Sequence, residues 1–116
     1  MRENVIKTKS FAFAVRIVNV YKFLISEKKE FVMSKQLLKS GTAVGALYRE
    51  AEQAESKLDF IHKMGIAQKE CNETIYWLEL LHATEYLDEI QFNSINSDAI
   101  ELMKLITSII KSSKTN

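Results

Sequence analysis

The sequence contains no proline, only three glycines and a single cysteine among its 116 residues. Because proline is the strongest helix breaker, its absence favours long helices. One cysteine cannot form an internal disulfide or a cysteine-rich zinc site, which excludes disulfide-stapled folds and zinc-finger modules. Since no histidine lies near Cys71 in the sequence, we expect a reduced thiol that packs as a small apolar side chain rather than a reactive one.

Long apolar runs are also missing. Spanning a bilayer takes about 20 mostly apolar residues, but the best candidate, residues 11–25, is interrupted by Arg16, Asn19 and Lys22 at helical spacing. Near the N-terminus there is no unbroken apolar segment followed by a small-residue cleavage site, as a secretory signal would require. These absences predict a cytoplasmic protein that does not interact with a membrane.

What is present is a balanced globular composition, 47% hydrophobic and 27% charged, with a net charge of +1. This apolar fraction is too high, and the net charge too low, for intrinsic disorder. The length suits one small domain with a single core. We therefore predict one domain over residues 1–116, with disordered ends at about 1–6 and 112–116.

Apolar residues recur at helical spacing in four segments, and no segment shows the alternation of a strand. The predicted helices cover residues 7–26, 31–54, 57–84 and a last segment that starts near Ser94 or Ser97. A charged break at 27–30 and an ordinary loop at 91–96 separate them. Four amphipathic helices with short connections predict an all-α fold, an antiparallel up-and-down four-helix bundle.

The first predicted helix is apolar over more than half of its circumference, which is typical of a helix that buries two faces. The residues of its core stripe are expected to be Phe11, Ala14, Val15, Val18, Tyr21 and Ile25. Further apolar residues, including Phe13, Ile17 and Phe23, widen the stripe. We assign these three to a contact with a second subunit.

The second predicted helix carries two internal glycines, Gly41 and Gly45. The seam formed by Leu37, Gly41, Val44, Tyr48 and Ala51 continues in phase across them. This continuity favours a close approach to a neighbouring helix at Gly41, Ala43 and Gly45. The alternative is a kink or break near 40–42.

The third predicted helix opens with Ser56 and Asp59, a pair that resembles a capping box. Glu70, Glu73 and Trp77 share one edge of this helix. The simpler interpretation is a solvated acidic flank with a half-buried tryptophan. We favour a subunit contact in which Trp77 is the anchor and the two glutamates meet basic residues of a neighbour's first or second helix.

The nearly neutral total conceals a separation of charge along the chain. Residues 1–49 hold ten Lys/Arg and three Glu, a net charge of +7, whereas residues 50–101 hold three Lys and twelve Asp/Glu, a net charge of −9. Either the oppositely charged helices neighbour each other and set the register of packing, or the basic residues bind phosphates of RNA or DNA. The residues of the second interpretation are Arg2, Lys7, Lys9, Arg16, Lys28, Lys29, Lys35 and Lys39.

Signatures of catalysis are weak. A di-metal site in a bundle needs a Glu-x-x-His turn from each of two helices, but Glu79–His82 and the weaker Asp59–His62 lie in one predicted helix, about 30 Å apart at 1.5 Å per residue. The segment 40–45 lacks the Gly-Lys-Ser/Thr ending of a phosphate-binding loop. We predict no enzyme activity, no metal, no cofactor and no small-molecule substrate. A metal site between subunits around His62 or His82 is the remote alternative.

Several short motifs resemble a known family. The matching residues are Ser40, Gly41, Thr42, Ala43, Val44, Glu50, Ala51, Ala54, Asp59, Phe60, Lys63, Ile66, Ala67, Lys69, Glu70, Glu73, Thr74, Tyr76, Trp77 and Leu78. In these motifs the chain resembles the small bacterial "four helix bundle protein" family, whose members are similar to proteins encoded in intervening sequences of large-subunit ribosomal RNA genes. More distantly it resembles the accessory variability determinant of diversity-generating retroelements, which partners a reverse transcriptase and binds nucleic acid through a basic surface. The resemblance implies an antiparallel four-helix bundle that assembles as a ring-shaped homopentamer.

Together these observations predict a non-enzymatic, homo-oligomeric bundle that acts as a scaffold or interaction protein, with itself as the main partner. The alternative is an accessory protein that binds structured RNA or DNA through the basic surface of the first two helices.

Overall fold

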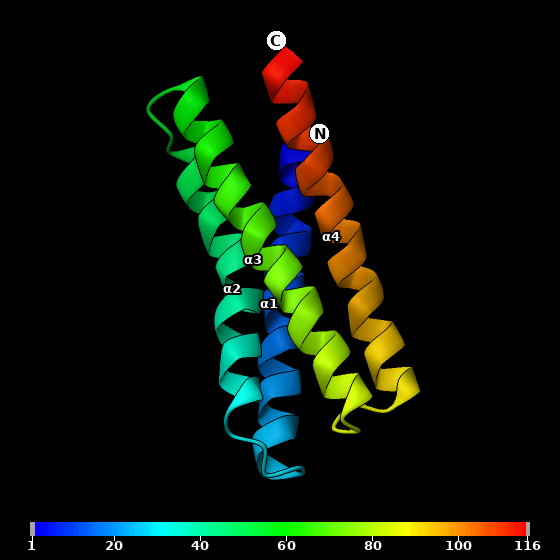
Figure 1. The fold of residues 1–116 in the computed structure, drawn as a ribbon. Helices are drawn as coiled ribbons and strands as arrows, with labels where there is room; N and C mark the ends of the chain where they lie inside the picture. The colour runs from blue at the N-terminus through cyan, green and yellow to red at the C-terminus, as the bar shows by residue number, and fades with distance from the viewer. Residues whose placement is uncertain (1, 116) are drawn as a thin grey trace.

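The chain forms four antiparallel helices that run up and down along a common axis (Figure 1). The computed structural model describes the backbone of residues 2–115 and the side chains of residues 5–115. The helices are α1 (Arg2–Ser26), α2 (Met33–Glu52), α3 (Lys57–Ala83) and α4 (Glu89–Thr115). Each packs on its neighbours in the order α1–α2–α3–α4–α1, and both chain ends lie at one end of the bundle (Figure 1). No strand occurs in the described residues, so the predicted all-α bundle is confirmed.

The start of α4 is the largest error in the predicted boundaries. The predicted loop at 91–96 is helical, and residues 84–88 make the connection between α3 and α4 instead. The backbone N–H of Gln91 donates to Asp88 Oδ1 at 2.7 Å, and the backbone N–H of Asp88 donates to Gln91 Oε1 at 2.9 Å. This reciprocal pair is a capping box that starts the helix at Glu89.

The ends of the chain also differ from the prediction. We expected residues 1–6 and 112–116 to lie outside the helices, but α1 begins at Arg2 and α4 continues to Thr115. Ile6 is fully buried, so burial of its side chain helps to hold the first turns of α1 in place. Met1 and Asn116 lie outside the described residues.

The bundle buries one continuous core to which all four helices contribute. The α1 side chains in it include Ile6, Phe13, Ile17 and Leu24, whose exposed fractions are 2% or less. The predicted faces of α1 are therefore reversed. Phe13 and Ile17 cannot contact a second subunit because they already pack inside this chain, and Phe23 is half-buried against the same core.

The two glycines of the α1–α2 seam permit close helix packing, as predicted. A Cβ atom at Gly41 would lie 2.7–3.0 Å from three side-chain carbons of Ile17, and one at Gly45 would lie 3.3 Å from the carbonyl oxygen of Ser10. Helix α2 is continuous through both positions. The alternative of a break near 40–42 is therefore wrong.

Between α1 and α2 the chain turns around a buried carboxylate. Glu30 is 8% exposed, and its two oxygens accept hydrogen bonds from the backbone N–H groups of Val32 at 3.1 Å, Met33 at 2.9 Å and Ser34 at 2.7 Å. These donors begin α2 and have no partner within the helix. Burial raises the pKa of Glu30, but the hydrogen bonds from Met33, Ser34 and Val32 outweigh burial and hold its pKa below the usual value of 4.5.

Over the residues that the structure describes, no helix is both long enough and apolar enough to cross a membrane.

Candidate interaction surfaces

The side of α1 that faces away from the core carries large apolar side chains. Phe11 is 59% exposed and Val15 is 47% exposed. Together with the partly exposed Val18, these residues form what we call the α1 outer face. The guanidinium of Arg49 in α2 lies 5.6 Å from the centre of the Phe11 ring, at the distance of a cation–π contact. The α1 outer face is the second apolar face that the sequence predicts for this helix, but it consists of other residues than expected.

A shallow hollow of about 430 Å³ lies beside Phe11, between α1 and α2. Its walls come from Phe11 and Ala14 on one helix and from Thr42, Gly45 and Ala46 on the other. The α2 side chains at this place are small, so they leave the space beside Phe11 open. The hollow therefore extends the α1 outer face onto α2.

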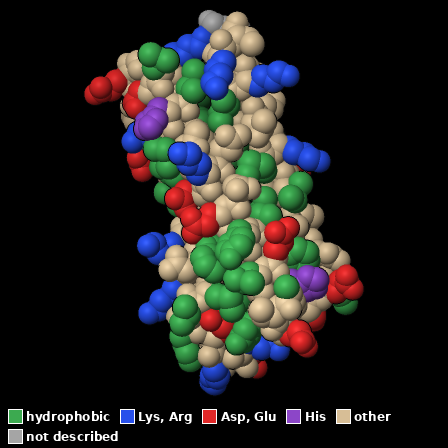
Figure 2. All heavy atoms as spheres, viewed as in Figure 1, with side chains coloured by type: hydrophobic (Ala, Val, Ile, Leu, Met, Phe, Trp, Pro, Cys, Tyr) green, Lys and Arg blue, Asp and Glu red, His purple; other side chains and the backbone are tan. Residues whose placement is uncertain are grey.

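A second exposed surface runs along α3 and contains the predicted contact residues Glu70, Glu73 and Trp77. We call these three residues with Tyr76 the α3 edge. Tyr76 is 54% exposed and meets Trp77 edge-on with ring centres 5.0 Å apart, while the indole N–H of Trp77 donates to Glu73 Oε2 at 3.0 Å. Figure 2 shows hydrophobic side chains gathered in the middle of this face of the molecule, with acidic groups beside them.

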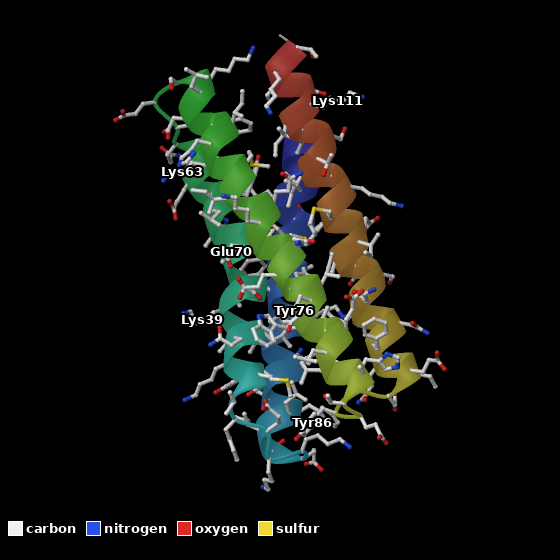
Figure 3. All side chains as sticks on the ribbon, viewed as in Figure 1. Lys39, Lys63, Glu70, Tyr76, Tyr86 and Lys111 are labelled. Atoms are coloured by element: carbon white, nitrogen blue, oxygen red, sulfur yellow. The ribbon has the colours of Figure 1, made fainter. Side chains whose placement is uncertain are left out.

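The structure brings the α3 edge next to the basic part of α2. Figure 3 shows Glu70 and Tyr76 on the same viewed face of α3, with Lys39 on the neighbouring α2. The four salt bridges among the described side chains include neither Glu70 nor Glu73. The two carboxylates are thus available to cations of another molecule, although Glu73 also orients the Trp77 ring.

Three members of the predicted phosphate-binding set form ion pairs with carboxylates of this chain, and a fourth is not described. Lys7, Lys9 and Arg16 are engaged within the chain, with Glu52 at 3.2 Å, Glu101 at 3.0 Å and Asp98 at 2.6 Å respectively. The side chain of Arg2 lies outside the described residues. Opposite charges therefore meet within the bundle at these three positions, as the simpler interpretation of the charge separation predicts.

The other four members of that set follow one another in the chain, with Lys28 and Lys29 in the α1–α2 turn and Lys35 and Lys39 in the first two turns of α2. Lys28, Lys29, Lys35 and Lys39 are exposed, and none of them takes part in a salt bridge among the described side chains. Lys28 lies 5.9 Å from the ring centre of Phe23. These four lysines are the members of the predicted phosphate-binding set that have no carboxylate partner among the described side chains.

The residues considered for catalysis or metal binding lie apart from one another. His82 stacks on Phe92 with ring centres 4.4 Å apart and planes 7° from parallel. Cys71 is buried, and burial raises its pKa to about 11, so its thiol is protonated at neutral pH. In the part of the chain whose side chains are described, no three His, Cys, Asp or Glu residues come together as a metal site would require.

A groove of about 440 Å³ opens between α1 and α4 near the 84–88 connection. Val20, Phe23 and Leu87 are among its apolar walls. Arg16 at its rim donates to Asp98 and to the carbonyl and hydroxyl oxygens of Ser94, so this guanidinium is already occupied. The groove suits an apolar side chain better than a charged substrate.

Comparison with known proteins assigns the family. The model of the family described as "23S rRNA-intervening sequence protein" matches residues 2–108. The chain belongs to the 23S rRNA-intervening sequence protein family. The resemblance noted in the sequence motifs is therefore confirmed.

A solved structure agrees with this membership of the 23S rRNA-intervening sequence protein family. A crystallised protein of unknown function from the S23 ribosomal protein family of Bacteroides thetaiotaomicron is 64% identical, with a TM-score of 0.95. The match covers 96% of this chain and 99% of that one. A search of curated proteins finds no match.

For this member of the family, sequence reasoning identified the α3 edge but missed the α1 outer face as a surface. It had assigned Phe11 and Val15 to the core. The sequence signal that could have distinguished the buried face of α1 from its outer face is a set of small residues, Ser10 in α1 with Gly41 and Gly45 in α2. Small residues on two neighbouring helices mark the sides on which the two backbones approach each other. That side of α1 had to be the buried one.

Proposed function

We propose that this family member is a non-enzymatic, homo-oligomeric scaffold or interaction protein whose copies associate through the α1 outer face and the α3 edge. The observation that supports this most strongly is the exposure of Phe11 and Val15 on a helix whose opposite side is fully used by the core. Covering an aromatic or branched apolar side chain stabilises a complex by about 1.5–3 kcal/mol.

Charge supports a contact between these two surfaces. Arg49 borders the α1 outer face, and the α3 edge carries Glu70 and Glu73, which have no salt bridge among the described side chains. Acidic groups of one copy would thus face basic groups of the next. Such pairs set the partner and the register more than they add affinity.

The two surfaces are different patches of one chain, so a contact between them is head-to-tail. Head-to-tail contacts between identical chains close into rings when the rotation between neighbours allows it. The sequence resemblance implies a ring of five, and this number is part of the proposal.

Molar mass in solution tests the proposal. Light scattering coupled to size exclusion is expected to give about 67 kDa for five copies of the 13.4 kDa chain at micromolar concentration. The double variant Phe11→Ser, Val15→Ser should lower the mass with little change in helicity, because neither side chain is in the core. The matched control is Ile90→Ser, which removes an 82% exposed apolar side chain from α4. A wild-type mass of 13.4 kDa would refute the proposal.

The α3 edge is tested separately with Trp77→Ala. If Trp77 anchors a neighbour, the variant should lose mass at a protein concentration at which its helical circular dichroism stays near that of the wild type. A variant that keeps its full mass while losing helicity would assign Trp77 to the core alone.

The four exposed lysines in the α1–α2 turn and the first two turns of α2 favour a second candidate function, binding of structured RNA or DNA. Four phosphate contacts predict that the logarithm of the binding constant falls with the logarithm of salt concentration at a slope of about −3 to −4. We expect Lys28→Glu with Lys35→Glu to abolish binding in a gel-shift titration, with Lys104→Glu on α4 as the control. Binding that is absent in low salt, or independent of salt, would contradict this candidate.

A further inference from the structure

The hollow between α1 and α2 has a cation at its rim that lacks a carboxylate partner. Arg49 lines this hollow beside Phe11, and it takes part in none of the salt bridges among the described side chains. The volume of about 430 Å³ lies within the range of about 300–1,000 Å³ that is typical of ligand pockets. The hollow therefore suits an apolar ring that carries an acidic group beside it.

Further charges lie along α2 on both sides of the hollow. Lys39 precedes the lining residue Thr42 by three residues, which places it on the same side of the helix. Lys39 is exposed and has no salt bridge among the described side chains. At the other end, Glu55 and Arg49 line a second hollow together, and Glu55 is also exposed without a salt bridge in this part of the chain. The order along this surface is lysine, apolar hollow, arginine, glutamate.

The outer side of α3 carries the complementary order. Tyr76, which is 54% exposed (Figure 3), lies three residues after Glu73 and three residues before Glu79. Lys69 precedes Glu73 by four residues. All three charged side chains are exposed, and none takes part in a salt bridge among the described side chains. Since residues three or four apart lie on neighbouring turns of one side of a helix, the order along α3 is glutamate, aromatic ring, glutamate, lysine.

We propose that Tyr76 of a second copy fills the hollow beside Phe11, where Glu73 of that copy meets Arg49. This inference rests on the proposed self-association and names the side chain that enters the hollow and the ion pair at its rim. Burial of the two rings supplies affinity, whereas the ion pair selects the partner and the register. Because Arg49 gains a carboxylate in the contact, the hollow is filled without leaving its cation buried and unpaired.

The remaining charges fix the direction in which the two helices run past each other. With the ion pair formed, α3 of the second copy has its Glu79 toward Lys39. Its Lys69 lies at the other end of the contact, toward Glu55. The reversed direction would bring Lys69 toward Lys39, and like charges across an interface suppress a wrong arrangement. The two glutamates beside Tyr76 are about 9 Å apart along α3 and the two cations beside the hollow about 15 Å apart along α2 at 1.5 Å per residue, a difference that the flexible lysine side chain spans.

Filling the hollow from within the chain tests whether a second copy uses it. Ala46→Phe places a ring in the hollow from an exposed position of α2, so helical circular dichroism should stay near that of the wild type. The concentration at which the assembly dissociates should rise at least tenfold, and Tyr76→Ser should have the same effect. Ala12→Phe, at an exposed position of α1 beside α4, is the matched control and should keep the wild-type mass. If either Ala46→Phe or Tyr76→Ser dissociated at the wild-type concentration, the inference would be overturned.

Exchange of the two charges tests the ion pair and its direction. Arg49→Glu and Glu73→Lys should each weaken the assembly, and the double variant should dissociate at a concentration at least tenfold lower than either single variant. Lys104→Glu, at an exposed position of α4, is the control for the change in net charge. A double variant no stronger than the single ones, or recovery when Glu73→Lys is combined with Lys39→Glu instead, would contradict the proposed pairing. A wild type that is monomeric would refute the proposed function itself, so the two failures are distinguishable.

Discussion

Glu30 provides a direct test of how the turn between α1 and α2 is stabilised. Its buried carboxylate accepts three backbone N–H groups at the start of α2, and Ser34 Oγ donates to the Glu30 carbonyl oxygen at 2.8 Å. The backbone N–H of Glu30 also donates to Leu24 at the end of α1. Glu30 thus joins two helices, with its backbone bonded to α1 and its carboxylate to the start of α2, and we predict that Glu30→Gln and Glu30→Ala both destabilise the fold.

The size of the effect follows from the hydrogen bonds. A hydrogen bond to a charged group contributes about 1.5–3 kcal/mol, and a buried donor left without a partner costs about 1–3 kcal/mol. Because the amide of Gln keeps one acceptor oxygen, Glu30→Gln should lower the free energy of unfolding by about 1 kcal/mol. Glu30→Ala removes all three bonds, but only the Ser34 N–H lies in a buried bond, and water can replace the carboxylate at the part-buried Val32 and Met33 N–H groups. We therefore expect Glu30→Ala to lower the free energy of unfolding by about 2–3 kcal/mol.

The measurement is urea denaturation followed by circular dichroism between pH 7 and pH 3, at a protein concentration where the oligomeric state is unchanged. The pKa of Glu30 is lower in the folded protein than its usual 4.5. The stabilisation by the carboxylate is therefore complete above the pKa that Glu30 has in the unfolded chain, and it is lost as the pH falls through the lower pKa that Glu30 has in the folded protein. The difference between the wild type and Glu30→Gln should be largest above about pH 5 and shrink in more acidic solution.

Glu27→Gln is the matched control, because Glu27 lies in the same turn and its side chain is exposed. This variant should keep the stability of the wild type throughout the pH range. A Glu30→Gln protein as stable as the wild type at pH 7 would refute the assignment of the carboxylate as the cap of α2. A difference that stays constant down to pH 3 would refute the role of its charge.

Three further predictions address the core and the surface pairs. Gly41→Ala should lower the free energy of unfolding by about 1–2 kcal/mol, because overpacking against Ile17 costs more than the gain in helix propensity. In an Ile17→Ala background the same change should become stabilising. If Gly41→Ala raised the stability of the otherwise wild-type protein, the close packing at this position would be contradicted. Native Cys71, with its pKa raised to about 11, should react with iodoacetamide at pH 8 at least about 100-fold more slowly than in the urea-unfolded chain; equal rates would show that the thiol is accessible. Asp98→Asn should cost less than about 1 kcal/mol in the same denaturation assay, because its pair with Arg16 is about 40% exposed; a loss above about 2 kcal/mol would show that the pair acts as a buried one.

Helix boundaries could be predicted where the sequence carries its own stop and start signals. The absence of proline and the charged break before α2 placed that helix within two residues at each end, and Ser56 starts α3 by accepting a hydrogen bond from the Asp59 backbone N–H at 3.0 Å. The carboxylate of Asp59 accepts from Glu55 rather than from Ser56 itself, so the capping box is only partly formed. The start of α4 was missed although Asp88 and Gln91 carry the spacing of a capping box.

The candidate surfaces were harder to predict, because periodicity gives the width of an apolar stripe but not the direction in which it faces. Helix α1 is apolar over more than half of its circumference, so Phe11 and Phe13 were equally good candidates for the core until the packing of the neighbouring helices was known. Trp77 and Glu73 could be assigned to an exposed edge because the apolar stripe on the buried side of α3, with Met64 and Leu78, is narrower than the apolar stripe of α1.

The sequence by itself determined the number of helices, their order and the approximate bounds of α2 and α3, since these depend on local propensity, capping and periodicity along one segment at a time. It also determined that α1 has two apolar faces, because that is a property of one helix. Only the tertiary structure decided which of these faces is buried and that Lys7, Lys9 and Arg16 are neutralised within the chain. Both depend on groups far apart in sequence, because packing against Gly41 and pairing with Asp98 exist only after the helices have assembled.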